Sequence, residues 1–190
     1  MLEKIPTAVG AVLSGLKAGM EKTAYRAAFA DIPETLRLTS SAFADGADIP
    51  ARFTADGPGT SPPLAWEGMP SGASTLVLLV EDAGSPTPQP FVHLIVWNLS
   101  ITAGSLAEGA LPSPDQGSSR LSLGQNSFLR SEWLPPDPPG GHGSHAYVFQ
   151  LYALRDALDL PENPGRSALL DAMRGHVIAK GRLIGTYART

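Results

Sequence analysis

The strongest pattern in the sequence is a set of three apolar stretches separated by turn residues. They cover residues 75–81, 91–99 and 145–152, and the first two are nearly continuous in apolar side chains. Short runs of this kind, bounded by Gly, Pro and Ser, are typical of β-strands. Because the first two lack a polar face, we expect both faces of their sheet to be covered. The pattern predicts a mostly β protein.

Alternation assigns the side chains of these strands to faces, because successive residues of a strand point to opposite sides. The predicted faces are Leu76, Leu78, Val80 and Asp82; Phe91, His93, Ile95 and Trp97; and His145, Tyr147, Phe149 and Leu151. A carboxylate and two imidazoles therefore lie on otherwise apolar faces. Burying such a group without a partner costs about 1–3 kcal/mol or more. We expect these groups to bond one another or a ligand.

The first 28 residues carry a helical pattern instead, and they predict an amphipathic helix from Leu2 to about Ala28. Its glycines cost about 1 kcal/mol each relative to alanine. The helix would therefore dock against its own domain or a twin subunit, with loose membrane contact or a frayed tail as alternatives. The predicted organisation is a helical extension, residues 1–34, followed by a β domain, residues 35–190.

Shorter elements are predicted around the main strands. The sequence indicates strands at 35–39 and 50–54, an extended edge at 61–66, and mostly loop over 100–142. A helix begins at Pro164 to Ser167, with a stripe of Leu169, Leu170, Met173 and Val177. Gly181 is expected to end that helix, and a last strand follows over 182–189.

Composition narrows the function classes. The net charge is −4 and only 17% of residues are charged, which argues against nucleic acid or an anionic membrane as the main partner. The absence of cysteine excludes disulfides, thiol catalysis and thiolate zinc sites, and it is compatible with the cytoplasm, where we expect the protein. The amphipathic segment is interrupted by charge, so we expect neither a signal peptide nor a transmembrane segment.

Four polar side chains near the strand ends form the candidate site: Asp82, His93, His145 and Tyr147. An acid that accepts a hydrogen bond from an imidazole fixes its tautomer and favours its charged form. Two imidazoles and a phenol would then offer donors to an anion. A phosphoryl group can accept several such bonds at once, and nearby prolines would add rigid apolar walls.

Other chemistries fit these residues less well. His142 and His145 resemble half of a metal site, but no cysteine or compact His/Glu cluster supplies the remaining ligands. No Gly-x-Ser-x-Gly elbow marks a serine nucleophile, and no phosphate-cradling or dinucleotide motif implies a cofactor. We interpret His176 as a surface residue and the tryptophans as packing residues.

Several motifs occur in register along the chain, at residues 53–57 with 61–66, 80–86, 93–98, 138–142 with 145–149, and 175–179 with 185–187. In this order they resemble the phosphatidylethanolamine-binding protein family, specifically its bacterial branch of Raf-kinase-inhibitor-like proteins. The resemblance runs from about residue 36 to residue 189 and leaves residues 1–28 outside. It implies a β-sandwich with peripheral helices.

The resemblance also implies that six residues line a pocket for phosphate-like anions: Asp82, Pro86, His93, Pro139, His145 and Tyr147. This chain departs from the family motif Asp-Pro-Asp-Ala-Pro, because Ala83 replaces its first proline and Gly84 its second acid. Ala146 stands where a basic residue is usual. The missing acid would leave Asp82 as the only carboxylate at this corner, and the missing base would lower the positive potential.

The leading hypothesis is non-enzymatic binding of a small anionic or phosphorylated ligand, such as phosphate or a phospholipid head group, in a pocket at the rim of the sandwich. Its affinity should fall above pH about 6.5 if imidazolium donors bind it. One alternative is a protein-interaction or inhibitor module, which leaves room for a protein partner; a homodimer is also compatible with the sequence. Another is a weak hydrolase that uses His93 with Asp82. A cis Ser85–Pro86 bond would suit the tight corner beside the site.

Overall fold

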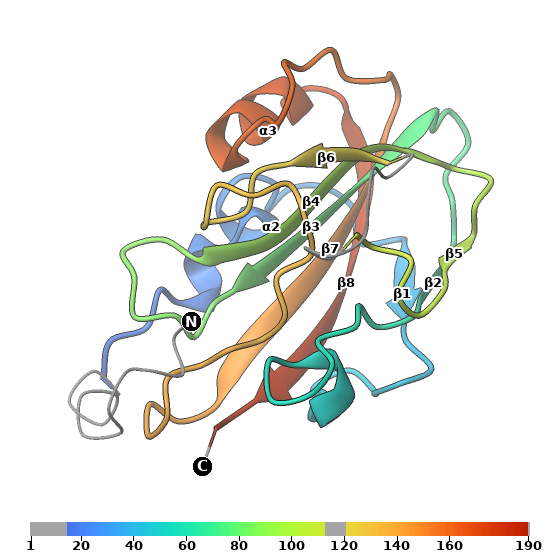
Figure 1. Ribbon diagram of the computed structural model, residues 1–190. Helices are drawn as coiled ribbons and strands as arrows, with labels where there is room; N and C mark the ends of the chain where they lie inside the picture. Colours follow the sequence, from blue (N-terminus) through green and yellow to red (C-terminus); the bar gives the residue numbers. More distant parts are fainter. Residues whose placement is uncertain (1–14, 113–120, 190) are drawn as a thin grey trace.

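Two antiparallel sheets form the molecule in the computed structural model, which describes residues 15–112 and 121–189. The larger sheet has five strands in the order β6 (Ser122–Gly124), β4 (Phe91–Ser100), β3 (Thr75–Asp82), β7 (His145–Leu154) and β8 (Val177–Tyr187). The smaller sheet has the order β1 (Arg37–Thr39), β2 (Leu64–Glu67) and β5 (Ser105–Leu106). The predicted mostly β, two-sheet architecture is confirmed (Figure 1).

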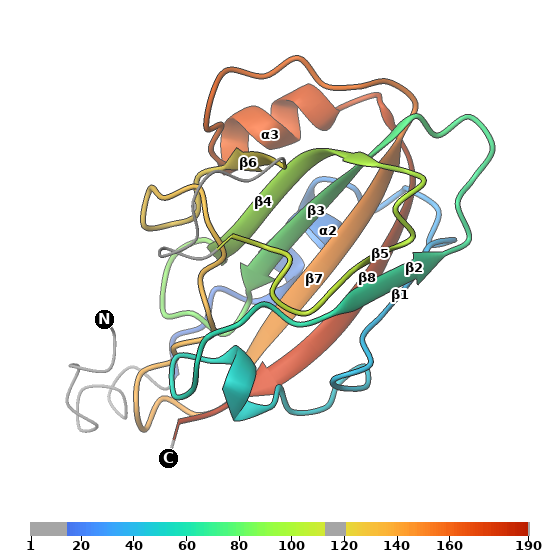
Figure 2. The ribbon, with the colours of Figure 1, turned by 45° about the vertical axis from the view of Figure 1, so that its right-hand side comes forward.

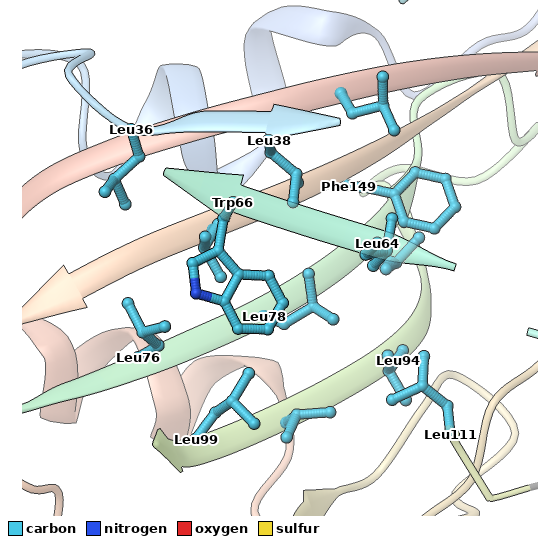
Figure 3. Close-up of a cluster of buried hydrophobic side chains, with 14 of the residues drawn as sticks. Leu36, Leu38, Leu64, Trp66, Leu76, Leu78, Leu94, Leu99, Leu111 and Phe149 are labelled. Carbon is cyan, nitrogen blue, oxygen red and sulfur yellow. The ribbon is translucent and has the colours of Figure 1, made fainter. Parts of the chain in front are cut away.

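The main core lies between the two sheets. Leu38 and Trp66 from the smaller sheet pack with Leu76, Leu78 and Phe149 from the larger one, and all five side chains are buried. Figure 3 shows this cluster from the side of the smaller sheet. The alternate residues of β1 and β2 face solvent, which is the expected pattern for a sheet covered on one face.

A second core covers the opposite face of the larger sheet. It is formed by α3 (Arg166–Met173), α2 (Ala24–Ala27) and the residues after α2, which pack on β3 and β7. Figure 2 shows the smaller sheet and α2 on opposite sides of the larger sheet. The prediction that both faces of the long central strands are covered is therefore confirmed.

The predicted continuous helix up to Ala28 is wrong in the part that the structure describes. A single turn of 3-10 helix, η2 (Met20–Lys22), and the short α2 are separated by Thr23, whose ψ of 150° is not helical. Gly19 has a φ of 96°, in the left-handed region that favours glycine. The N–H groups of Ala18 and Gly19 donate to the carbonyl oxygens of Ser85 and Ala83 at 2.8 and 2.9 Å. The rest of the predicted helix, residues 1–14, lies outside the described residues.

The segment around α2 docks on its own domain through a buried carboxylate. Glu81 is 0% exposed and accepts hydrogen bonds from the Ala24 N–H at 2.8 Å, Gln150 Nε2 at 2.8 Å and Arg166 Nε at 2.6 Å. One residue of β3 thereby joins α2, β7 and α3. Docking on its own domain, one of the sequence interpretations, is what the described part of the segment does.

Several predicted boundaries are corrected by local backbone geometry. The segment predicted as a strand at 50–54 contains a 3-10 helix, η3 (Ala51–Phe53). The helix α3 ends at Met173, well before Gly181, because Gly175 turns the chain with a φ of 77° and β8 begins at Val177. The predicted edge strand becomes β2, which lies in the centre of the smaller sheet. The stretch 100–142 contains the short strands β5 and β6.

A bulge corrects the predicted face of β4. The register of β3 against β4 shifts between Val80 and Glu81, so that His93 is an extra residue without a partner in the pairing. A bulge re-aims the side chains beyond it. Ile95 and Trp97 consequently pack in the second core, whereas strict alternation had placed them with His93.

Candidate functional site

A cavity of about 110 Å³ lies where the end of β3 meets the starts of β4 and β7. The strands bring its residues together because Asp82 is in register with Tyr147 on one side and with Phe91 on the other. All six residues predicted for the site line this cavity: Asp82, Pro86, His93, Pro139, His145 and Tyr147. The volume corresponds to several water molecules or one small polyatomic group.

A chain of hydrogen bonds leads away from the cavity through two buried histidines. Asp82 Oδ2 contacts His145 Nδ1 at 2.7 Å, and His145 Nε2 contacts His142 Nδ1 at 2.7 Å. His142 Nε2 then contacts the Leu16 carbonyl oxygen at 3.1 Å. A carbonyl oxygen only accepts, so we assign one proton to His142 Nε2 and one to each of the other two hydrogen bonds. Asp82, His145 and His142 therefore share three protons along this chain.

This chain changes the role expected for His145. Both of its ring nitrogens bond other side chains, and the remaining oxygen of Asp82 accepts the Gly84 N–H at 2.7 Å. The prediction that two imidazoles offer donors to an anion is therefore wrong for His145. The contribution of His145 to the cavity is therefore the face of its ring.

His93 keeps one ring nitrogen unused. Its Nδ1 lies 2.8 Å from the Leu134 carbonyl oxygen, which requires a proton on Nδ1. No partner is found for Nε2 within residues 15–112 and 121–189, and the ring is only 4% exposed. Burial lowers the pKa of His93, while the nearby Asp82 carboxylate partly opposes this shift. The ring is therefore neutral at pH 7, and Nε2 is a hydrogen-bond acceptor.

Tyr147 provides the second unused polar atom. Its side chain is 0% exposed, and its hydroxyl has no hydrogen-bond partner within the described ranges. Burial, together with Asp82 and Asp137, raises the pKa of Tyr147 well above its usual value, so the hydroxyl keeps its proton. The ring of His93 meets the Tyr147 ring edge to face at 5.1 Å. The two unused polar atoms therefore belong to neighbouring rings.

Sequence reasoning missed a second carboxylate in the cavity wall. Asp137 lines the cavity and accepts a hydrogen bond from Arg189 Nη1 at 2.6 Å. Arg189 also donates from Nη2 to Asp56 at 2.6 Å and bonds the Pro138 carbonyl oxygen at 3.3 Å. This arginine thereby fixes the loop that carries Pro139. The expectation that Asp82 is the only carboxylate at the corner is wrong, because Asp137 lines the same cavity.

Local geometry explains the glycine that replaces the second acid of the family motif. A Cβ on Gly84 would lie 2.7 Å from the Cα of His145, closer than real Cβ atoms come to backbone. Glycine at this position lets the two loops approach closely enough for the Asp82–His145 hydrogen bond. The Ser85–Pro86 bond beside it is trans, so the cis bond that would have suited this corner does not occur.

The walls of the cavity are mostly apolar, and several of them were not predicted. Phe91 and Phe128 pack edge to face at 5.2 Å on one side, with Leu134 and Pro135 beside them. Phe128 belongs to a turn in which Asn126 Oδ1 accepts its N–H at 2.9 Å. The only sequence feature that could have indicated these residues is the apolar character of Phe128 and Leu134. Loop residues do not alternate as strand residues do, so no periodicity assigns them to a face.

The described part of the chain lacks both a metal-binding cluster and a membrane-spanning helix. It contains no group of three or more His, Cys, Asp or Glu side chains placed to hold a metal ion. None of its helices has the length and apolar character needed to cross a membrane.

The fold and site define a two-sheet β protein with a small, partly polar cavity at one end of the larger sheet. The family model described as phosphatidylethanolamine-binding protein matches residues 39–188. The chain belongs to this family.

Relatives support this assignment along most of the chain. UPF0098 protein PH1269 of Pyrococcus horikoshii is 38% identical, over 79% of this chain and 75% of its own. A UPF0098 protein of Chlamydia trachomatis is 39% identical, over 81% of this chain and 99% of its own. A candidate lipoprotein of Mycobacterium tuberculosis, LppC, is 38% identical over 81% of this chain and 73% of its own.

Solved structures agree on the fold. A phosphatidylethanolamine-binding protein homolog from Chlamydia trachomatis has a TM-score of 0.73 and 37% identity, covering 83% of this chain and 99% of its own. YbcL of E. coli, described as a new member of the mammalian PEBP family, has a TM-score of 0.75 and 23% identity, covering 82% of this chain and 99% of its own. The latter similarity supports the fold alone.

Proposed function

We propose that this protein binds a small anionic ligand, in the first place a phosphate or phosphoryl group, in the cavity between β3, β4 and β7, and that it does so without catalysing a reaction. The observation that carries the proposal is the Tyr147 hydroxyl, which is fully buried in the cavity wall and has no partner among the described residues. A buried hydroxyl without a partner costs about 1–3 kcal/mol. An oxyanion would supply the missing acceptor.

The surroundings of the hydroxyl support the same ligand chemistry. The Tyr147 hydroxyl is a donor at any moderate pH because burial raises its pKa. The cavity is small and is lined by Pro86, Pro135 and Pro139, whose rings fix their own backbone, so that little entropy is lost on binding. The family that matches this chain is named after phosphatidylethanolamine, a lipid whose head group contains phosphate.

A phosphate titration followed by NMR tests the proposal. Inorganic phosphate should shift the ring signals of His93, while those of the exposed His176, which bonds Asp156, serve as an internal reference. Replacing Tyr147 by Phe should weaken binding about tenfold or more, because a hydrogen bond to a charged group contributes about 1.5–3 kcal/mol.

Tyr152 offers a matched control for that variant. It is a fully buried tyrosine on the same strand, but it lies in the second core and its hydroxyl donates to Gln150 at 2.7 Å. Tyr152→Phe should reduce stability and leave phosphate affinity unchanged. Unchanged His93 signals at high millimolar phosphate, sulfate and acetate would refute anion binding in this cavity.

The geometry bears on the hydrolase alternative as well. That alternative paired His93 with Asp82, whereas His93 Nδ1 contacts the Leu134 carbonyl oxygen and the Asp82 carboxylate bonds His145 and Gly84. We therefore favour a binding role over catalysis. Turnover of simple esters that is lost in His93→Ala would contradict this choice. A cytoplasmic location is part of the proposal and is tested by cell fractionation.

A further inference from the structure

A short segment ahead of α2 is bonded to the loop that forms one wall of the cavity. We call residues 16–19 the strap; it is drawn in blue ahead of α2 in Figure 1. The N–H groups of Ala18 and Gly19 donate to the carbonyl oxygens of Ser85 and Ala83 at 2.8 and 2.9 Å. Both acceptors belong to the loop between β3 and β4, and Ser85 lines the cavity. The strap therefore braces a cavity wall.

The strap has a second attachment, which runs through histidine. His142 Nε2 contacts the Leu16 carbonyl oxygen at 3.1 Å. The same ring begins the chain of hydrogen bonds that continues through His145 to Asp82, with two contacts of 2.7 Å. Leu16 is thus connected through two imidazoles to the carboxylate that ends β3.

The three contacts of this chain need three protons. The Leu16 carbonyl oxygen only accepts, so its contact with His142 requires a proton on Nε2. The contact between the two rings and the contact of His145 with Asp82 require one proton each. Two neutral imidazoles supply two protons, so the third is additional. When that proton leaves, one of the three contacts must place two acceptors face to face.

The contact with the strap is the least costly of the three to lose. His142 and His145 are each 1% exposed, and Asp82 is 5% exposed. Facing acceptors in either inner contact would therefore stay buried away from water, which is expensive. Leu16 is 57% exposed, so the end of the strap can move toward water.

We propose that the strap is a pH-sensitive brace, held on His142 while the chain from Asp82 carries its third proton and released from His142 when that proton leaves. The attached state binds one proton more than the released state. The attachment is therefore complete at low pH and weakens as pH rises, by about tenfold per pH unit once the proton begins to leave. This inference goes beyond ligand binding and does not depend on which ligand the cavity holds.

The groups that surround the chain bear on the pH of release. Histidine is the side chain that ordinarily changes charge between pH about 5 and 8, and the strap should be released in or near this range. Lys17 of the strap lies beside the chain, because its Nζ donates to the Ser144 carbonyl oxygen at 3.4 Å. The other titratable and charged groups around the two rings are Asp82 from β3, His93 from β4, Tyr147 from β7, and Asp137 with its partner Arg189.

NMR of the full chain between pH about 5 and 9 tests the proposal. The ¹⁵N shifts of the His142 and His145 rings report when the shared proton leaves. Amide exchange, corrected for its intrinsic pH dependence, reports the attachment of Ala18 and Gly19. We expect the protection of these two amides to fall by about tenfold or more with the same midpoint as the ring signals. The Gly46 amide, which donates to the Ile184 carbonyl oxygen at 2.8 Å, is the internal reference and should keep its protection.

A pair of variants assigns the pH dependence to its residue. His142→Gln removes the titrating ring, so the protection of Ala18 and Gly19 should no longer change with pH. His176→Gln is the matched control, because His176 is a partly exposed histidine that bonds Asp156 at 3.1 Å, and this variant should keep the wild-type profile. If His142→Gln does not fold, the coincidence of ring titration and amide protection in the wild type still decides the proposal.

Three results would overturn the inference. The first is constant protection of Ala18 and Gly19 while the two rings titrate. The second is a chain that keeps one protonation state from pH about 5 to 9. The third is a His142→Gln variant that retains the wild-type fall in protection. None of them depends on added phosphate, so they are distinct from a failure of the proposed anion binding.

Discussion

A buried lysine holds the segment around α2 to the rest of the molecule, and removing its charge should cost several kcal/mol. The Lys180 side chain on β8 is 1% exposed. Its ammonium donates to the carbonyl oxygens of Phe29 at 2.6 Å, Tyr25 at 3.1 Å and Ala30 at 3.3 Å. It also lies 4.2 Å from the centre of the Tyr25 ring. Burial desolvates the ammonium and thereby lowers the pKa of Lys180.

The magnitude follows from what Lys180→Met leaves behind. Tyr25 and Phe29 are buried, and the Tyr25 carbonyl oxygen would lose this donor at about 1–3 kcal/mol. The Phe29 carbonyl oxygen would lose its shorter hydrogen bond and keep the Ile32 N–H at 3.3 Å. Ala30 is exposed, so water can replace its bond. Removing the ammonium also removes its desolvation cost, which offsets part of the loss. We expect Lys180→Met to lower the free energy of unfolding by about 2–4 kcal/mol.

Urea unfolding at pH 7 measures this change, and amide exchange locates it. The variant should unfold at lower urea with an unchanged m-value, and its Tm should fall by about 2–4 °C for each kcal/mol. Amides of residues 24–30 should exchange faster. Lys22→Met is the matched control, because the Lys22 side chain is exposed and its ammonium donates to the Pro88 carbonyl oxygen at 3.1 Å. This variant should change stability by less than about 0.5 kcal/mol. A Lys180→Met variant as stable as this control would show that the hydrogen bonds only offset the cost of burying the charge.

Two further predictions concern local charge and local strain. Hydrogen bonds from Arg189 lower the pKa of Asp56, so the stability that this carboxylate contributes is present above pH about 3.9 and is lost as pH falls through its folded-state pKa. In the Asp56→Asn variant, the Tm measured in thermal scans should therefore fall less steeply as pH decreases below about 4. A fall in Tm with pH as steep as that of the wild type would contradict the pairing of Asp56 with Arg189. Leu129 is 75% exposed with a φ of 60°, so Leu129→Gly should raise stability by about 0.5 kcal/mol in urea unfolding. Leu129→Ala keeps the Cβ and should give no gain, so an equal gain from alanine would refute strain as the cause.

The candidate site could be predicted because its residues break a strong pattern. Asp82, His145 and Tyr147 stand at the ends of strands whose other inward positions are apolar, and antiparallel pairing brings those ends together. Alternation from His145 to Leu151 holds in the structure because β7 is central and has a regular register through these residues. Strand patterns of this strength depend little on distant contacts.

The remaining parts of the site depend on contacts that no local pattern contains. Asp137 reaches the cavity from a loop, and its partner Arg189 lies 52 residues further along the chain. The role of His142 depends on Leu16, whose carbonyl oxygen is supplied from 126 residues away. The face of His93 is decided by a single extra residue in β4, which shifts the register without leaving a signal in the composition.

Tertiary hydrogen bonds also decide the structure of residues 15–28, where the sequence pattern predicted a continuous helix. The connection of this segment to the site runs through two adjacent residues of β3. Glu81 and Asp82 are both buried and point to opposite faces of the sheet, so one carboxylate bonds the Ala24 N–H while the next bonds His145. A shift of this strand end would disturb both bonds, since a single peptide unit joins the two residues. The segment that lies outside the matched family region is therefore bonded to the residue that precedes Asp82, and Asp82 lines the cavity.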